Sequence, residues 1–239
     1  MKRRHFITLL GGTAVAWPLA ARAQQGERMR RIGVLMGWNE TDREAQSNLA
    51  AFVQELQQLG WTGGRNMRID YRWSNGDVNR MQIFSKELVG SAPDAILAHT
   101  TPVTAALQRE TRTVPIVFVV VSDPVGEGFV AGLSHPGGNI TGFVHTEGEF
   151  AGKLLELLTE IAPTVKRVAI MFNPDTAPGR GSSYLPSFET AARSFRLEAI
   201  AAPVRNDAEI QAIVAMLDVR RAAVSSQCPT ASRWFIGLQ

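Results

Sequence analysis

The chain of 239 residues is long enough for one large or two small domains, and its hydrophobic content of 45% is that of a globular protein. A single cysteine, Cys228, excludes an internal disulfide, so a packed core must stabilise the fold. The formal net charge of +3 comes from a short N-terminal segment that we expect to be removed, and the remaining 21 basic and 22 acidic residues indicate no nucleic-acid or membrane-surface partner.

Residues 1–23 have the features of an export signal. The basic head Lys2-Arg3-Arg4 precedes an apolar run that is too short to span a bilayer, and Ala21-Arg22-Ala23 is an A-x-A cleavage site. The order K-R-R-x-F-I matches the twin-arginine pattern of bacterial export of folded proteins. No cysteine follows the cleavage site, so no lipid anchor is expected. We predict cleavage after Ala23 and a periplasmic location; the alternative is a buried N-terminal helix.

From residue 30 onward, short apolar runs alternate with amphipathic helical patterns. The predicted strands of the first half are residues 32–36, 66–73, 95–98, 116–121 and 140–144. The predicted helices are residues 41–60, a helix capped by Asp77 and ended by Gly90, and a third that opens at Thr100 and Thr101 before Pro102. The run at 116–121 is the most hydrophobic, and we expect it at the centre of the sheet.

A second set of elements follows a break near residues 143–148. The predicted order is a helix at 149–162, a strand at 168–172, a Gly-rich loop at 179–183, a helix at 184–195, a strand at 197–204 and a helix at 207–217. Repeated β-α-β units predict parallel sheets with helices on both faces. We therefore predict an α/β protein of two Rossmann-like lobes, residues 28–145 and 146–217, with fewer units in the second.

Several motifs resemble those of one known family. They are the export signal, RIGVLM at 31–36, LGW at 59–61, VFVVVSDPV at 117–125, PGGNITG at 136–142 and FNP at 172–174. From residue 1 to about 217 the chain is similar to the substrate-binding proteins of ABC importers, in the subgroup that includes receptors for aromatic amino acids. The resemblance implies a type I periplasmic-binding-protein fold, whose two lobes close on a small ligand and dock on a permease in the inner membrane. It implies a monomer without a cofactor.

Residues 218–239 depart from this family, whose members continue well beyond this length. The segment has neither helical nor strand periodicity. Codons can be chosen for residues 223–239 that, read two bases later, spell GLIAMPDSFTVVHRPA, which resembles the strand and turn that the family implies here. We therefore expect a frameshift near residues 217–223, an unstructured tail, and an incomplete second lobe that impairs ligand binding. A natural short variant is the alternative.

Polar residues and one tryptophan follow four of the predicted strands. Ligands of parallel α/β sheets lie at the carboxyl ends of strands, and this rule selects Trp38, Asn39, Thr100, Thr101, Ser122, Asp123, Asn173 and Asp175. The three hydroxyl side chains suit a ligand carboxylate, and Asp123 or Asp175 can accept a hydrogen bond from an ammonium group. Trp38 can stack on an aromatic side chain. Helix capping is the alternative for the two threonines and Asp123, and packing is the alternative for Trp38.

Enzyme motifs are mostly absent from the sequence. The four histidines have no metal-ligand spacing, Ser134 lies outside a G-x-S-x-G motif, and no catalytic residue, cofactor or metal is predicted. Gly126, Gly128 and Gly132 match a dinucleotide-binding turn only weakly. Two hypotheses result: a receptor for a small organic, amino-acid-like ligand, or an exported Rossmann-type oxidoreductase that binds a nucleotide. The resemblance favours the receptor.

Overall fold

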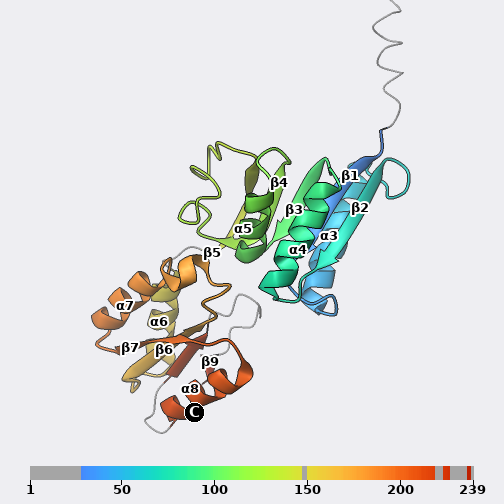
Figure 1. The fold of residues 1–239 in the computed structure, drawn as a ribbon. Coiled ribbons are helices and arrows are strands. Elements are labelled where there is room, and N and C mark those ends of the chain that lie inside the picture. Colours follow the sequence, from blue (N-terminus) through green and yellow to red (C-terminus); the bar gives the residue numbers. More distant parts are fainter. Residues whose placement is uncertain (1–27, 147–149, 219–222, 227–235, 238–239) are drawn as a thin grey trace, which may run out of the picture.

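A computed structural model describes residues 28–146, 150–218, 223–226 and 236–237. These residues form two α/β lobes, each built on its own sheet (Figure 1). The predicted export signal lies outside the described residues. No helix in the part of the chain that the structure describes is long and apolar enough to cross a membrane.

The first lobe is built on a five-stranded parallel sheet. Its strands are β1 (Arg30–Met36), β2 (Met67–Trp73), β3 (Ala95–His99), β4 (Ile116–Ser122) and β5 (Ile140–Thr146), in the order β2-β1-β3-β4-β5. This order reverses between β1 and β3, and such a switch point opens a crevice beyond the carboxyl ends of the two strands. The fold therefore provides a place for a ligand next to the residues that follow β1 and β3.

Three helices cover the two faces of this sheet. They are α3 (Arg43–Gln58), α4 (Val78–Gly90) and α5 (Thr101–Glu110). Apolar residues of α4 and α5, including Leu88 and Leu107, pack on one face with Phe118, whereas Leu49 and Phe52 of α3 pack on the other. Each helix presents one apolar stripe to the sheet, as the spacing of three and four residues predicts.

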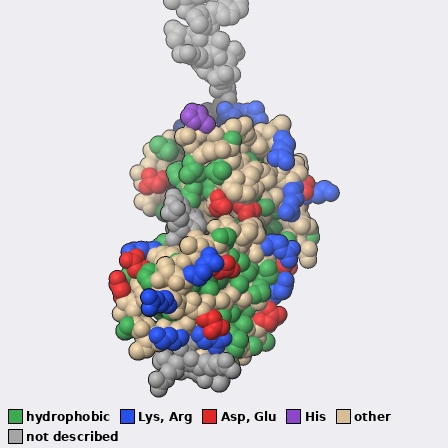
Figure 2. All heavy atoms as spheres, turned by 90° about the vertical axis from the view of Figure 1, so that its left-hand side faces the viewer, with side chains coloured by type: hydrophobic (Ala, Val, Ile, Leu, Met, Phe, Trp, Pro, Cys, Tyr) green, Lys and Arg blue, Asp and Glu red, His purple; other side chains and the backbone are tan. Residues whose placement is uncertain are grey.

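The second lobe has a four-stranded sheet in the order β7-β6-β8-β9. Its strands are β6 (Arg167–Phe172), β7 (Glu198–Pro203), β8 (Ala223–Ser226) and β9 (Ile236–Gly237), and its helices are α6 (Phe150–Ile161), the short 3-10 turn η1 (Pro178–Gly181), α7 (Leu185–Ser194) and α8 (Asp207–Asp218). Leu155 and Phe188, from α6 and α7, pack on one face of β6, and Leu217 of α8 packs on the other. Figure 2 shows acidic and basic side chains intermixed over the visible face of this lobe, in keeping with the near-neutral composition.

The structure differs from the sequence predictions in three respects: the position of one strand, the bounds of several elements, and the tail. The predicted central strand, β4, lies between β3 and β5, and β3 is the middle strand. A long apolar run reflects burial on both faces, which every inner strand shares, and carries no information on strand order. Strand β5 also extends to Thr146, one residue past the predicted boundary.

The third difference lies in the tail, for which we expected no structure. Residues 223–226 form β8, which pairs in parallel with β6, and residues 236–237 form β9, which pairs antiparallel with β8. Backbone groups at an open sheet edge accept a short strand whatever its side-chain period, so the pattern gave no signal. The other residues of the predicted tail, apart from Asp218 at the end of α8, lie outside the described residues.

Candidate functional site at the tips of the strands

The loops after β1 and β3 meet at the switch point of the first sheet. The backbone N–H of Gly37 donates a hydrogen bond of 3.3 Å to Nδ1 of His99, which fixes the proton of the neutral ring on Nε2. The Trp38 ring meets the His99 ring edge-on, with centroids 4.4 Å apart. Burial lowers the pKa of His99 to about 4, and the charge of nearby Asp42 opposes this effect. His99 is therefore a neutral hydrogen-bonding group at this site.

Thr100 occupies a constrained position directly after β3. Its backbone has φ 88° and it precedes α5 without a side-chain capping bond. Among the described residues, its buried Oγ1 has no hydrogen-bond partner, and neither has Nε2 of His99. A Cβ at Gly37 would lie 2.5 Å from this Oγ1, so only glycine leaves room for the loop. Unpaired buried polar atoms are costly and cluster where ligands or ordered waters bind.

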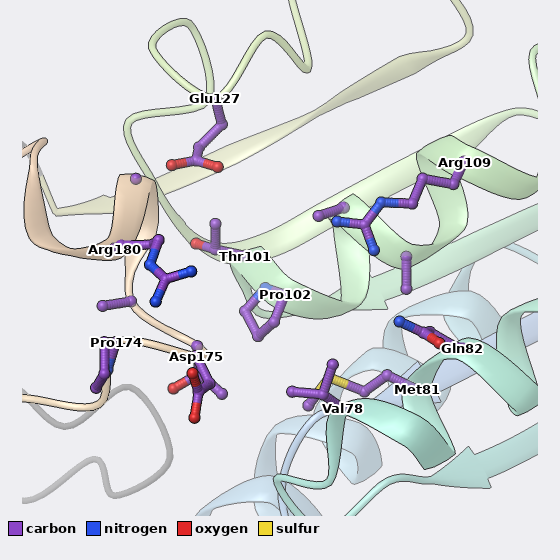
Figure 3. Close-up of a pocket in the computed structure, with 15 residues that line it drawn as sticks. Val78, Met81, Gln82, Thr101, Pro102, Arg109, Glu127, Pro174, Asp175 and Arg180 are labelled. Atoms are coloured by element: carbon purple, nitrogen blue, oxygen red, sulfur yellow. The ribbon is translucent and has the colours of Figure 1, made fainter. Parts of the chain in front are cut away.

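A cavity of about 190 Å³ lies where the first lobe meets the loop after β6 (Figure 3). The first lobe lines it from α4 and α5 and through Glu127. The second lobe contributes residues from 174 to 180. The lining residues are Val78, Met81, Gln82, Thr101, Pro102, Ala105, Ala106, Arg109, Glu127, Pro174, Asp175, Thr176, Ala177, Gly179 and Arg180. Because residues of both lobes line it, a molecule bound here would be held between them.

Four charged side chains line this cavity. Arg109 extends from α5 and Arg180 from the loop after β6, and Figure 3 shows both directed toward the space between α5 and that loop. The carboxylate of Asp175 accepts a bond of 3.0 Å from Nε of Arg205. Burial raises the pKa of Glu127, and the nearby backbone N–H of Gly179 opposes this effect. Glu127 of the first lobe therefore lies close to Gly179 of the second lobe.

The cavity brings together two of the eight predicted site residues, Thr101 and Asp175. Thr101 Oγ1 also accepts the backbone N–H of Ser122 at 3.3 Å, which places Ser122 directly behind the lining. Trp38 and Thr100 lie at the switch point and are buried. Trp38, Thr100, Thr101 and Ser122 lie at the tips of β1, β3 and β4, as the sequence predicts.

The remaining predicted residues make local turn contacts outside the cavity lining. Asn39 Oδ1 accepts the N–H and hydroxyl of Thr41, each at 3.0 Å. Asp123 Oδ1 accepts the N–H of Gly126 at 2.9 Å, and Asn173 Oδ1 accepts the N–H of Asp175 at 2.9 Å. The bond of Asp123 closes a turn and caps no helix, because no helix lies between β4 and β5.

Sequence reasoning missed five polar lining residues: Gln82, Arg109, Glu127, Thr176 and Arg180. Gln82 and Arg109 lie within helices, where the strand-tip rule does not reach. Arg180 belongs to the Gly-rich loop that follows β6, and its position after a predicted strand was a usable signal. The glycines from 126 to 132 lie in a connection between β4 and β5 that contains no helix, so the helix required by a dinucleotide-binding turn is missing there. No group of three or more potential metal ligands occurs among the residues described.

Comparison with known proteins identifies the family. Residues 44–234 match the family model described as ABC transporter substrate binding protein. A tyrosine-binding protein of Clostridioides difficile (strain R20291) is 26% identical over 166 residues, which are 70% of this chain and 47% of the relative. The chain therefore spans about half the length of that curated relative.

Solved structures of other proteins share this fold. A conserved domain protein of Vibrio cholerae is 25% identical with a TM-score of 0.71, covering 80% of this chain and 62% of that one. An ABC domain of Streptococcus pneumonia in complex with L-Trp has a TM-score of 0.73 at 23% identity, covering 83% and 65%, which shows a shared fold. The chain belongs to the family of ABC transporter substrate-binding proteins, as its motifs predict. Because this is a family of solute-binding proteins and not of enzymes, it favours the receptor over the oxidoreductase hypothesis.

Proposed function

We propose that this member of the ABC transporter substrate-binding family captures a small, amino-acid-like solute in the periplasm and delivers it to an ABC permease for import. The observation that carries the proposal is the cavity lined by strand-tip and helix residues of both lobes. A solute held between two lobes can stabilise a closed arrangement that a permease distinguishes from the empty one. Because the chain spans 47% of the length of the tyrosine-binding relative, its solute and partner are proposals.

The amino-acid-like ligand is supported by the relatives and by the chemistry of the lining. One relative is named for binding tyrosine, and one structure of the same fold holds L-Trp. Guanidinium groups and hydroxyls, which suit a carboxylate, surround the cavity together with apolar side chains from α4 and α5. We propose that Thr101 and Asp175 contact the solute directly, and that Trp38, Asn39, Thr100, Ser122, Asp123 and Asn173 shape the strand tips around it.

A thermal-shift screen tests this proposal. The panel contains L-tyrosine, L-tryptophan, L-phenylalanine, L-leucine, the corresponding deaminated acids, NAD and ATP. A solute at about 100 times its Kd stabilises the folded protein by about 2.7 kcal/mol, which is a measurable rise in Tm. Stabilisation by amino acids or organic acids, with none by NAD or ATP, is expected. Stabilisation by nucleotides alone would contradict the receptor.

A further inference from the structure

We infer that the solute is a net-anionic organic acid whose acidic group is bound by Arg180 and Arg109, and that the site does not require an ammonium group. The inference rests on the proposed function, since it names the chemical class of solute for the same cavity. It follows from which charged groups of the lining already have partners and which do not.

Both carboxylates of the lining are engaged by the protein. Asp175 accepts a hydrogen bond of 3.0 Å from Arg205, which is an ordinary length for an N–H···O bond. Glu127 lies close to the backbone N–H of Gly179 across the lobe boundary. Burial and the charge of Asp123 raise the pKa of Glu127, so this carboxyl carries its negative charge less readily than a free one. A ligand ammonium would have to compete for these groups.

Both guanidinium groups of the lining lack such a partner. Within the described parts of the chain, no ion pair or side-chain hydrogen bond joins Arg109 or Arg180 to an acidic group. A guanidinium group offers a planar fork of donors that matches a carboxylate. In the described parts of the chain, the lining therefore presents two exposed guanidinium groups without an acidic partner, whereas Asp175 is paired with Arg205.

A buried hydroxyl adds an independent indication of a polar ligand. Thr176 lines the cavity, is only 3% exposed, and its Oγ1 has no hydrogen-bond partner among the described residues. Leaving such a group unpaired costs about 1–3 kcal/mol, and an oxygen of a bound acid can satisfy it. The hydroxyl lies in the same loop as Arg180, so the two groups can share one carboxylate.

The rest of the cavity suits a small apolar body. Val78, Met81, Pro102, Ala105 and Ala177 provide apolar walls. The volume of about 190 Å³ is below the roughly 300–1,000 Å³ of sites for drug-sized ligands, which indicates a solute of amino-acid size or smaller. An α-ammonium next to the two guanidinium groups would be repelled, and it would have to share Asp175 with Arg205. A deaminated acid of the same shape avoids this cost.

Calorimetric titration of the full chain with three matched probes tests the inference. The probes are 3-phenylpropionate, L-phenylalanine and 2-phenylethylamine, which carry the acid, both groups and the amine, respectively. We expect 3-phenylpropionate to bind about tenfold more tightly than L-phenylalanine, and 2-phenylethylamine to give no heat. Arg180→Gln should weaken 3-phenylpropionate binding by about tenfold or more, since it removes a charge-assisted bond.

Arg196→Gln is the matched control. Arg196 is exposed, lies in the same lobe, has φ 57° against φ 58° for Arg180, and is not part of the lining. Its change should leave the affinity unaltered. Tighter binding of L-phenylalanine than of 3-phenylpropionate, or an Arg180→Gln variant with full affinity, overturns the inference and leaves the proposed function standing. Absence of binding by all three probes overturns the inference, and the thermal-shift panel then decides the proposed function.

Discussion

At the scale of single residues, the switch point of the first sheet depends on a histidine held neutral. His99 is 2% exposed and accepts the N–H of Gly37, so the folded protein disfavours the imidazolium form. Its pKa falls from 6.5 to about 4, mainly through burial. Above pH 6.5 the ring is neutral in both the folded and the unfolded chain and contributes nothing to pH dependence. Between pH 6.5 and about 4 only the unfolded chain gains the proton. The free energy of unfolding therefore decreases as the pH is lowered through this range.

We predict that lowering the pH from 7 to 5 reduces the free energy of unfolding by about 2 kcal/mol through His99, at about 1.4 kcal/mol per pH unit below 6.5. His99→Asn keeps an acceptor for the Gly37 N–H and cannot titrate, so it should lose this part of the pH dependence. Urea unfolding at pH 7, 6 and 5 measures the effect. His135→Asn, at an exposed histidine, serves as the control and should keep the full slope. An unchanged slope in His99→Asn would contradict the assignment.

The close approach of the first two strand tips gives a second residue-scale prediction. A Cβ at Gly37 would lie 2.5 Å from Oγ1 of Thr100 and 3.0 Å from the backbone oxygen of His99. Gly37→Ala should therefore destabilise the fold by about 1–3 kcal/mol, as overpacking does. Gly138→Ala is the comparison, because a Cβ there meets nothing within 4 Å. Equal denaturation midpoints for the two variants would show that a Cβ at Gly37 fits without strain, which contradicts the structure.

At the scale of elements, the N-cap residue Asp77 determines where helix α4 begins. Asp77 accepts the N–H groups of Asn79 and Arg80 at 2.8 and 3.1 Å, and α4 then presents Val78, Met81 and Gln82 to the cavity. The aspartate pairs two donors that the first helical turn leaves free. The same residue that starts the helix therefore fixes the position of one cavity wall.

Replacing this cap should weaken the helix. We predict that Asp77→Ala lowers the free energy of unfolding by about 1 kcal/mol, whereas Asp77→Asn, which keeps a side-chain acceptor, changes it by a few tenths. Urea denaturation followed by circular dichroism measures both. The structure would be wrong about the cap if alanine and asparagine had the same effect.

Helices and strands with a clear hydrophobic pattern could be predicted from the sequence. A strand that forms only because a neighbouring strand offers an open edge could not. The sequence indicated α3 because Ala45, Leu49 and Phe52 recur on one face, and it indicated β6 as a buried apolar run. Strand β8 has only four residues and forms because β6 offers an open edge. For the site, the strand-tip rule found Thr101 and Asp175, but Arg109 lies more than two turns into α5, beyond the reach of that rule.

At the scale of the whole molecule, two sheets with separate cores share one boundary. The hydrophobic clusters of the two lobes have no residue in common, and Glu127 of one lobe lies close to Gly179 of the other beside the cavity. A boundary with few direct contacts leaves relative motion of the lobes inexpensive. A solute between them can therefore act as the main link, as the receptor function requires.

The central claim is that the solute occupies the cavity between the lobes, and one titration tests it most directly. Gln82 is exposed and lines the cavity, whereas Lys86, one turn further along α4, is exposed and does not. The binding of 3-phenylpropionate and of L-phenylalanine is measured by calorimetry. Gln82→Trp should weaken the binding of whichever probe binds by about tenfold or more, because the indole fills space that the solute needs. Lys86→Trp should leave the affinity unchanged. Undiminished affinity in Gln82→Trp would place the solute elsewhere and contradict the account.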